Sequence, residues 1–167
     1  MNPSIAQCRY LLSLAGPILA GLDDTHRALE PRPGAKTAGW LVGHLVVSGD
    51  YALRLCGRRT ACPAAWPPMF NPGSQPSTDP LDYPTMAALR DTFGRVYEEL
   101  CRAARDADPA RLAAANPFAP ARVAFPTAGD FVAYLLSSHL GYHLGQLVAW
   151  RAAAGLGRLQ RPDVLAA

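Results

Sequence analysis

The sequence has few charged residues and no concentration of positive charge. Of its 167 residues, 17% are charged, and the formal net charge is +3. Arg58 and Arg59 form the only adjacent pair of basic residues, and no basic stripe is interleaved with aromatic side chains. Proteins that bind nucleic acids usually carry such a basic surface because it neutralises phosphates. We therefore expect no nucleic-acid partner.

The cysteines lack the spacing of a zinc knuckle or of a disulfide scaffold. No two of them form a Cys-x-x-Cys pair, and they stand at Cys8, Cys56, Cys62 and Cys101. Disulfides persist mainly in oxidising compartments, so free thiols in a reducing cytosol are the simpler interpretation. This pattern favours a cytoplasmic protein.

Long apolar runs are also missing. A membrane-spanning helix needs about 20 consecutive, mostly apolar residues, and no stretch reaches that length. The apolar segment at residues 10–22 follows a single basic residue, Arg9, and is interrupted by Pro17. We interpret it as part of a first helix rather than as a signal peptide, and we expect no membrane partner.

Apolar residues, which make up half of the sequence, recur with helical periodicity in four segments. The pattern predicts helices at residues 4–24, 37–57, 84–107 and 127–155, with Thr37 and Thr127 as N-caps. Residues 58–84 contain seven prolines and predict a connection without helices or central strands. We therefore predict an all-α fold, a single domain over residues 1–167 that forms a four-helix bundle with a long crossover between helices 2 and 3. A lid, a dimer arm and a passive crossover all fit the connection.

Three histidines fall on the helix faces that should point into this bundle. His139 and His143 are four residues apart, so both project from one side of a helix at a spacing of about 6 Å. His44 lies on the apolar stripe of the second segment. A buried imidazole without a partner costs about 1–3 kcal/mol, so each ring needs a hydrogen bond, a water molecule or a metal. Ordinary half-buried histidines and a shared metal ion both satisfy this requirement, whereas His26 lies in a polar turn and is expected at the surface.

Three nitrogen ligands without a carboxylate would leave coordination positions open, as in catalytic zinc sites. Zinc or nickel suits such a ligand set, and copper, cobalt and iron are also compatible. Three more residues share the histidine faces and are candidates for cofactor binding: Gln146, Trp40 and Tyr51. The amide would hydrogen-bond a ligating histidine or a substrate, the indole would wall the pocket, and the phenol would contact a ligand. Packing against other helices explains each of them as well.

Two stretches, GWLVGHLVVSGDYALRLCGR and SSHLGYHLGQLVAWRAAAG, resemble the DinB/YfiT-like superfamily of metal-binding four-helix bundles. The resemblance covers nearly the whole chain, and HLGYHLGQL is its most specific part. It implies that His44, His139 and His143 bind a divalent metal with open positions, and that the chain pairs into a homodimer. Some relatives are S-transferases or isomerases that use low-molecular-weight thiols such as bacillithiol or mycothiol. Some isomerases of the family have Glu at one of the late histidine positions, where this chain has His at both.

Two functions follow from this interpretation. The first is a metal-dependent thiol S-transferase or hydrolase that acts on a small electrophilic substrate, with the metal lowering the pKa of a bound thiol or water. No catalytic base is evident, because Asp50 and Asp130 lie off the histidine faces; Glu98 or Glu99 of the third helix could approach. The alternative is a non-catalytic bundle that binds a metal or a small ligand in a stress response.

Overall fold

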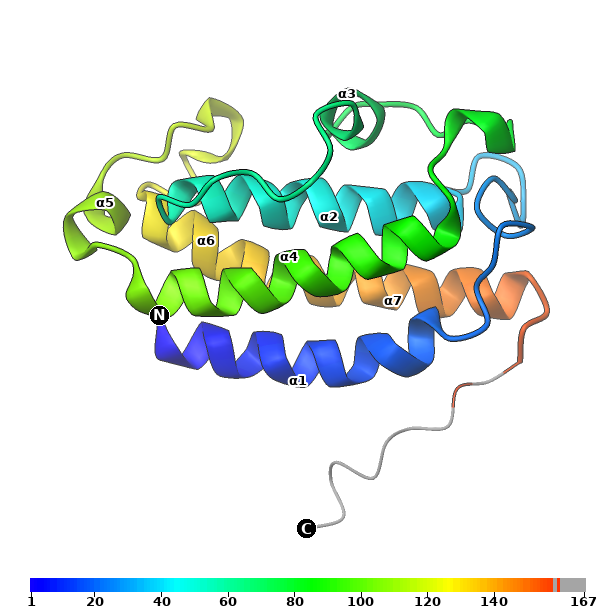
Figure 1. The fold of residues 1–167 in the computed structure, drawn as a ribbon, viewed down its shortest axis with the longest axis horizontal. Coiled ribbons are helices and arrows are strands. Elements are labelled where there is room, and N and C mark those ends of the chain that lie inside the picture. Colours follow the sequence, from blue (N-terminus) through cyan, green and yellow to red (C-terminus); the bar gives the residue numbers. More distant parts are fainter. Residues whose placement is uncertain (158, 160–167) are drawn as a thin grey trace, which may run out of the picture.

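Four long helical paths run side by side in the computed structural model, which describes residues 1–157 and 159 (Figure 1). They are α1 (Asn2–Leu19), α2 (Ala38–Leu55), α4 (Met86–Asp106) and the consecutive pair α6 (Ala128–Leu136) and α7 (Ser138–Ala153). α4 packs against both α1 and α2, and α6 with α7 closes the bundle on its other side. Within the described residues, strand-like pairing is limited to one isolated bridge between Ala115 and Thr127. The predicted all-α bundle is confirmed.

The helix α2 is surrounded by other elements over nearly its whole length. Thr37 caps its start as predicted, because the Thr37 hydroxyl accepts a hydrogen bond of 3.2 Å from the backbone N–H of Trp40. Almost every residue of α2 is buried, and His44 in its middle is only 4% exposed. A polar side chain at this position therefore has to find its partners inside the protein.

The prediction that residues 58–84 contain no helix is wrong. This connection includes the short helix α3 (Trp66–Phe70) and the 3-10 helix η1 (Pro80–Asp82). Prolines lie in the first turn of each, where the backbone N–H that proline lacks has no helical partner. α3 packs on α2 with Phe70 fully buried. The buried Asp50 holds the start of the connection by accepting a hydrogen bond of 3.0 Å from the Cys62 backbone N–H.

Two predicted helix boundaries also change. The first helix ends at Leu19 rather than at residue 24, because the chain turns at Gly21 with a φ of 73°. The fourth predicted helix is divided at Ser137, whose backbone leaves the helical conformation with φ −124° and ψ −89°. The Ser137 hydroxyl donates a 2.6 Å hydrogen bond to the Ala133 carbonyl and so competes with helical backbone bonding. The break places His139 in the first turn of α7.

The loop between α4 and α6 carries the remaining short elements, α5 (Pro109–Ala113) and η2 (Ala119–Ala121). At its end, Thr127 and Asp130 form the predicted capping interaction in both directions. None of the described helices is long and apolar enough to cross a membrane.

Candidate metal centre

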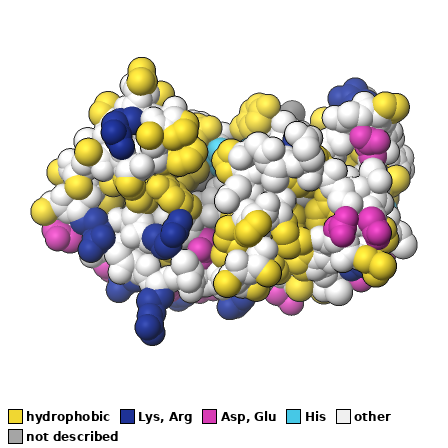
Figure 2. All heavy atoms as spheres, turned by 90° about the horizontal axis from the view of Figure 1, so that it is seen from above, with side chains coloured by type: hydrophobic (Ala, Val, Ile, Leu, Met, Phe, Trp, Pro, Cys, Tyr) yellow, Lys and Arg dark blue, Asp and Glu magenta, His cyan; other side chains and the backbone are white. Residues whose placement is uncertain are grey.

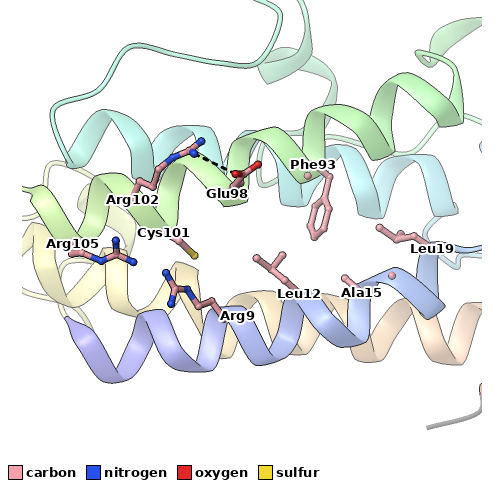
Figure 3. A pocket seen from close by; sticks show the side chains of 11 residues that line it. Arg9, Leu12, Ala15, Leu19, Phe93, Glu98, Cys101, Arg102 and Arg105 are labelled. Carbon is pink, nitrogen blue, oxygen red and sulfur yellow. Dashed lines mark hydrogen bonds and ion pairs between the residues drawn. The ribbon is translucent and has the colours of Figure 1, made fainter. Parts of the chain in front are cut away.

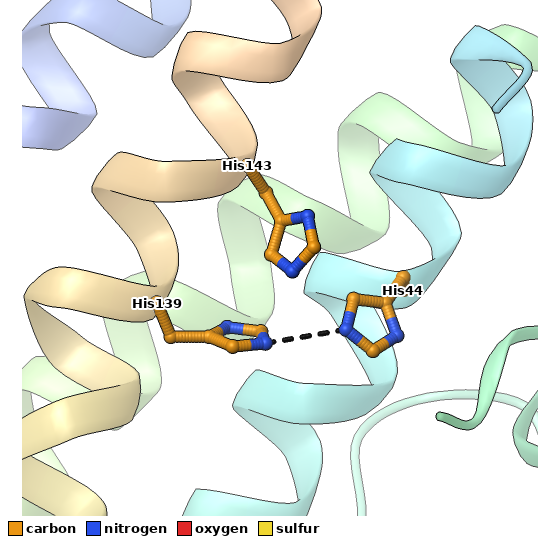
Figure 4. A group of neighbouring side chains, drawn as sticks. All are labelled: His44, His139 and His143. Atoms are coloured by element: carbon orange, nitrogen blue, oxygen red, sulfur yellow. Dashed lines mark hydrogen bonds between the residues drawn. The ribbon is translucent and has the colours of Figure 1, made fainter. Parts of the chain in front are cut away.

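The structure brings His44 of α2 together with His139 and His143 of α7 (Figure 4). One ring nitrogen from each residue lies within 4.8 Å of the other two. The Nε2 atoms of His44 and His139 are 3.2 Å apart. Two nitrogens bound to one tetrahedral zinc ion at about 2.1 Å would be about 3.4 Å apart, so the rings are close to a ligating arrangement.

Two of the three rings are held by hydrogen bonds from Nδ1. His44 Nδ1 lies 2.7 Å from the carbonyl oxygen of Phe70, and His143 Nδ1 lies 2.7 Å from the amide oxygen of Gln146. Because these oxygens only accept, Nδ1 carries the proton in both rings and the lone pair is on Nε2. Partners of this kind orient metal-binding histidines and fix their tautomer.

Burial keeps all three imidazoles neutral. It lowers the pKa of His44, an effect that the hydrogen bond to Phe70 opposes and the charge of Lys36 reinforces. Burial also lowers the pKa of His139 to about 3, and the neighbouring His143 and His44 act in the same direction. The pKa of His143 is lowered to about 4, again mainly by burial. At neutral pH the site therefore presents lone pairs, which is the state that metal binding requires.

The donor set fits a divalent transition metal, and the short contact between two of its nitrogens supports this. The Nδ1 atom of His139 is buried without a hydrogen-bond partner among the described residues. Without an ion, the Nε2 atoms of His44 and His139 can face each other only if His139 carries its proton on Nε2 and donates it to His44; otherwise their lone pairs repel. A shared cation removes that conflict, because both Nε2 atoms then donate to one centre.

Of the three candidates for cofactor binding, Gln146 and Trp40 contact the histidines and Tyr51 does not. Gln146 contacts His143 as described, and its own amide nitrogen donates to the Tyr142 hydroxyl at 3.1 Å. Trp40 stacks on His44 with ring centroids 4.8 Å apart and planes 6° from parallel. Tyr51 is not brought to the histidines; it packs against Phe118 and Phe131 at 6.1 Å from each.

Sequence reasoning missed three residues that contact the histidines. Tyr134 and Tyr142 lie edge-on to His139 and His143, with centroid distances of 5.5 and 5.0 Å. The position of Tyr142, four residues before Gln146, is a helical spacing that could have identified it. Phe70 contributes only a backbone carbonyl from a proline-rich segment, and no sequence signal marks such a partner.

The four carboxylates considered at the outset have other roles. Asp50 holds the connection after α2, and Asp130 caps α6. Glu98 and Glu99 both bind Arg102, at 3.2 and 3.1 Å. His26, expected at the surface, is instead partly buried edge-on against Trp150, 5.9 Å from its ring, and is not part of the histidine group.

Access to the centre is narrow. His44 is 4% exposed, and His139 and His143 are each 8% exposed. On the face drawn in Figure 2, one histidine side chain is visible at the bottom of a hollow in the surface. A cavity of about 270 Å³ adjoins Gln146 and is also lined by Arg32, Lys36 and Trp150. None of the described histidines lines this cavity, and its link to the histidine group is Gln146, which contacts His143.

Comparison with known proteins identifies the family. A family model described as the DinB superfamily matches residues 11–147, which is well over half of the chain and includes all three histidines. No curated protein and no solved structure gave a significant match. The helical bundle and the extent of the match agree with each other, and the chain belongs to the DinB superfamily.

Proposed function

We propose that the protein binds one divalent metal ion through His44, His139 and His143 and uses it to act on a small molecule. The observation that carries this proposal is the convergence of three buried, neutral imidazoles from two helices. Family membership supports it, because the matched region contains the whole ligand set.

Zinc or nickel is the proposed ion. Three imidazole nitrogens without a carboxylate suit both metals and leave at least one coordination position for an exogenous ligand. When bound, such an ion lowers the pKa of a thiol or water and so supplies a nucleophile at neutral pH. The contribution of the protein is to orient His44 through the Phe70 carbonyl and His143 through the Gln146 amide.

The proposed reaction is transfer of a low-molecular-weight thiol to a small electrophilic substrate, or hydrolysis of such a substrate. The cavity beside Gln146 has the size for a small ligand, and Arg32 and Lys36 line it. The Lys36 ammonium lies 4.0 Å from the centroid of the Trp40 ring, which itself stacks on His44. This positive charge next to the site favours a substrate or thiol that carries an anionic group.

A second function, binding of a metal or ligand without turnover, is favoured by one observation. Among the described residues, the carboxylates that could act as a general base are engaged elsewhere, in helix capping, loop anchoring and ion pairs. An enzyme that uses an already ionised thiolate needs no such base, whereas a hydrolase usually does.

Metal binding is tested by elemental analysis of protein purified without an affinity tag, before and after incubation with zinc or nickel. We expect about one ion per chain, lost in His139→Ala and His143→Ala and retained in His26→Ala. An absence of stoichiometric metal after addition of either ion would contradict the proposal.

Catalysis is tested with the metal-loaded protein, a low-molecular-weight thiol and chlorodinitrobenzene as a model electrophile. Turnover that disappears in His44→Ala supports the transferase. A thiol that raises the melting temperature but is not consumed with any electrophile supports binding without turnover.

A further inference from the structure

A second group of reactive side chains lies between α1 and α4, on a face separate from the histidines (Figure 3). A groove of about 500 Å³ runs between these two helices. Its lining includes Arg9 of α1 and Cys101, Arg102 and Arg105 of α4. The groove is open beside Gly16 of α1 and Gly94 of α4, because a Cβ added at either glycine would meet no atom within 4 Å.

Two thiols lie near each other at this groove, and one of them is part of its lining. The thiols of Cys8 of α1 and Cys101 of α4 are close enough for one to donate a hydrogen bond to the thiolate of the other. Cys8 is completely buried, whereas Cys101 is 5% exposed and lines the groove. A molecule that enters the groove therefore meets Cys101, whereas Cys8 has no exposed surface.

The three arginines that line the groove differ in whether a carboxylate neutralises them. Arg102 is neutralised by ion pairs with Glu98 and Glu99. Arg9 and Arg105 have no ion-pair partner in the part of the chain that the structure describes. In Figure 3, Cys101 points from α4 toward α1, and Arg9 extends from α1 toward it. The groove thus combines a thiol with two positive charges that have no ion pair among the described residues, and its one lining carboxylate, Glu98, is paired with Arg102.

These surroundings shift the pKa values of the two thiols in opposite directions. The hydrogen bond from Cys8 lowers the pKa of Cys101, and the charges of Arg9 and Arg105 act in the same direction against the effect of burial. The same hydrogen bond, with burial, raises the pKa of Cys8 far above its ordinary value. The attacking thiol of a dithiol pair needs thiolate character and access, and the second thiol needs neither until the first has reacted.

We propose that the groove between α1 and α4 is a thiol–disulfide exchange site for small anionic disulfides, with Cys101 as the attacking thiol and Cys8 as the resolving thiol. The Cys101 thiolate attacks one sulfur of the disulfide, forms a mixed disulfide and releases the first thiolate. Cys8 then attacks the Cys101 sulfur, forms the Cys8–Cys101 disulfide and releases the second thiolate, which takes up the Cys8 proton. The small disulfide is reduced to two thiols, and the cysteine pair is oxidised.

The other two cysteines provide an internal comparison. Cys62 is more exposed than Cys101, but burial and the nearby Asp50 raise its pKa to about 12. Burial raises the pKa of Cys56 to about 11. If exposure alone decided reactivity, Cys62 would react first; if the charged groove decides it, Cys101 reacts first.

The test is to treat the native, reduced protein with dithiobis(nitrobenzoate), an anionic disulfide, and to follow the modified cysteines by peptide mass spectrometry. We expect Cys101 to react about tenfold or more faster than Cys62. The product should contain the Cys8–Cys101 disulfide, with two nitrothiobenzoate ions released per pair. Earlier reaction at Cys62, or a stable adduct on Cys101 while Cys8 is present, would overturn the proposal.

Variants of the cysteines and arginines test the role of each thiol and of the positive charge in this reaction. Cys8→Ala should stop the reaction at the Cys101 adduct, and Cys101→Ala should remove the fast phase. Combined Arg9→Gln and Arg105→Gln should slow dithiobis(nitrobenzoate) more than the neutral bis(hydroxyethyl) disulfide, whereas Arg59→Gln, at an exposed residue outside the groove lining, should have little effect on either. Equal slowing of both reagents would overturn the anion preference. Metal content, measured in the same samples, should stay unchanged, because the groove lies apart from the histidines.

Discussion

The ring of Phe70 lies directly on the backbone of Gly43, where an added Cβ would be 2.5 Å from the ring carbons. This contact lets α3 approach α2 closely. It also positions the carbonyl of Phe70 beside the next residue, His44, whose Nδ1 lies 2.7 Å from that oxygen. A glycine on α2 thus controls the orientation of one candidate ligand through an element of the connection.

Gly43→Ala should weaken metal binding without removing a ligand. The new methyl group must displace the Phe70 ring and with it the carbonyl that orients His44, and loss of such a partner typically costs about 10- to 100-fold in affinity. Affinity is measured by competition with a chromophoric chelator.

Gly145→Ala is the matched control, because a Cβ there would meet no atom within 4 Å. The control should keep the affinity and gain about 0.5–1 kcal/mol of stability; equal affinity in both variants would argue against the role of Phe70.

Gln146→Leu should also weaken metal binding, because it removes the oxygen that accepts from His143 Nδ1. We expect a loss of about 10- to 100-fold with little change in stability. Gln146→Glu keeps an accepting oxygen and should retain most of the affinity. If both variants bind metal as tightly as the wild type, the hydrogen bond is not part of the site.

The sequence is sufficient to predict the bundle and the grouping of the histidines. Helical periodicity identifies which residues face inward, so His44, His139 and His143 could be expected to converge before their distances were known. The break at Ser137 could not be predicted, because it depends on a serine side chain that bonds the backbone within an otherwise helical pattern. The helix α3 was missed because prolines were counted as helix breakers, although two of them lie in its first turn.

The pairing of Cys8 with Cys101 was equally hidden in the sequence. The two cysteines are far apart along the chain and carry no motif, and only the packing of α1 on α4 brings them together. By contrast, the capping of α2 and α6 was predictable because it depends on residues a few positions apart.

The metal-free protein should lose stability in mild acid. The pKa values of His139 and His143 are lowered to about 3 and about 4, whereas histidines in the unfolded chain titrate near pH 6.5. Between these limits the unfolded chain binds protons that the folded protein does not, so acid favours unfolding. Stability is therefore complete above about pH 6.5 and falls as the pH approaches 4, with each histidine contributing a slope of up to about 1.4 kcal/mol per pH unit.

Urea unfolding in the presence of a chelator, at a series of pH values from 8 to 4.5, measures this slope. His143→Gln should make the curve shallower, because it removes one of the two strongly shifted groups. A wild-type curve that is flat over this range, or one that His143→Gln leaves unchanged, would contradict the buried neutral state of these rings.

Trp40 and Tyr51, which lie on the same helix as His44, should differ in their effect on metal binding. Trp40 stacks on His44, and its indole N–H donates a 2.9 Å hydrogen bond to Ser74 of the connection. Trp40→Leu removes both contacts, so we expect His44 to lose part of its fixed orientation and the metal affinity to fall several-fold. Tyr51→Phe keeps the ring that packs on Phe118 and Phe131 and should leave the affinity unchanged. Titration of both variants with the same chelator compares them directly.

A loss in Tyr51→Phe as large as that in Trp40→Leu would mean that the aromatic cluster around Tyr51 is coupled to the histidines. The coupling would run through Tyr134, which contacts both Phe131 and His139.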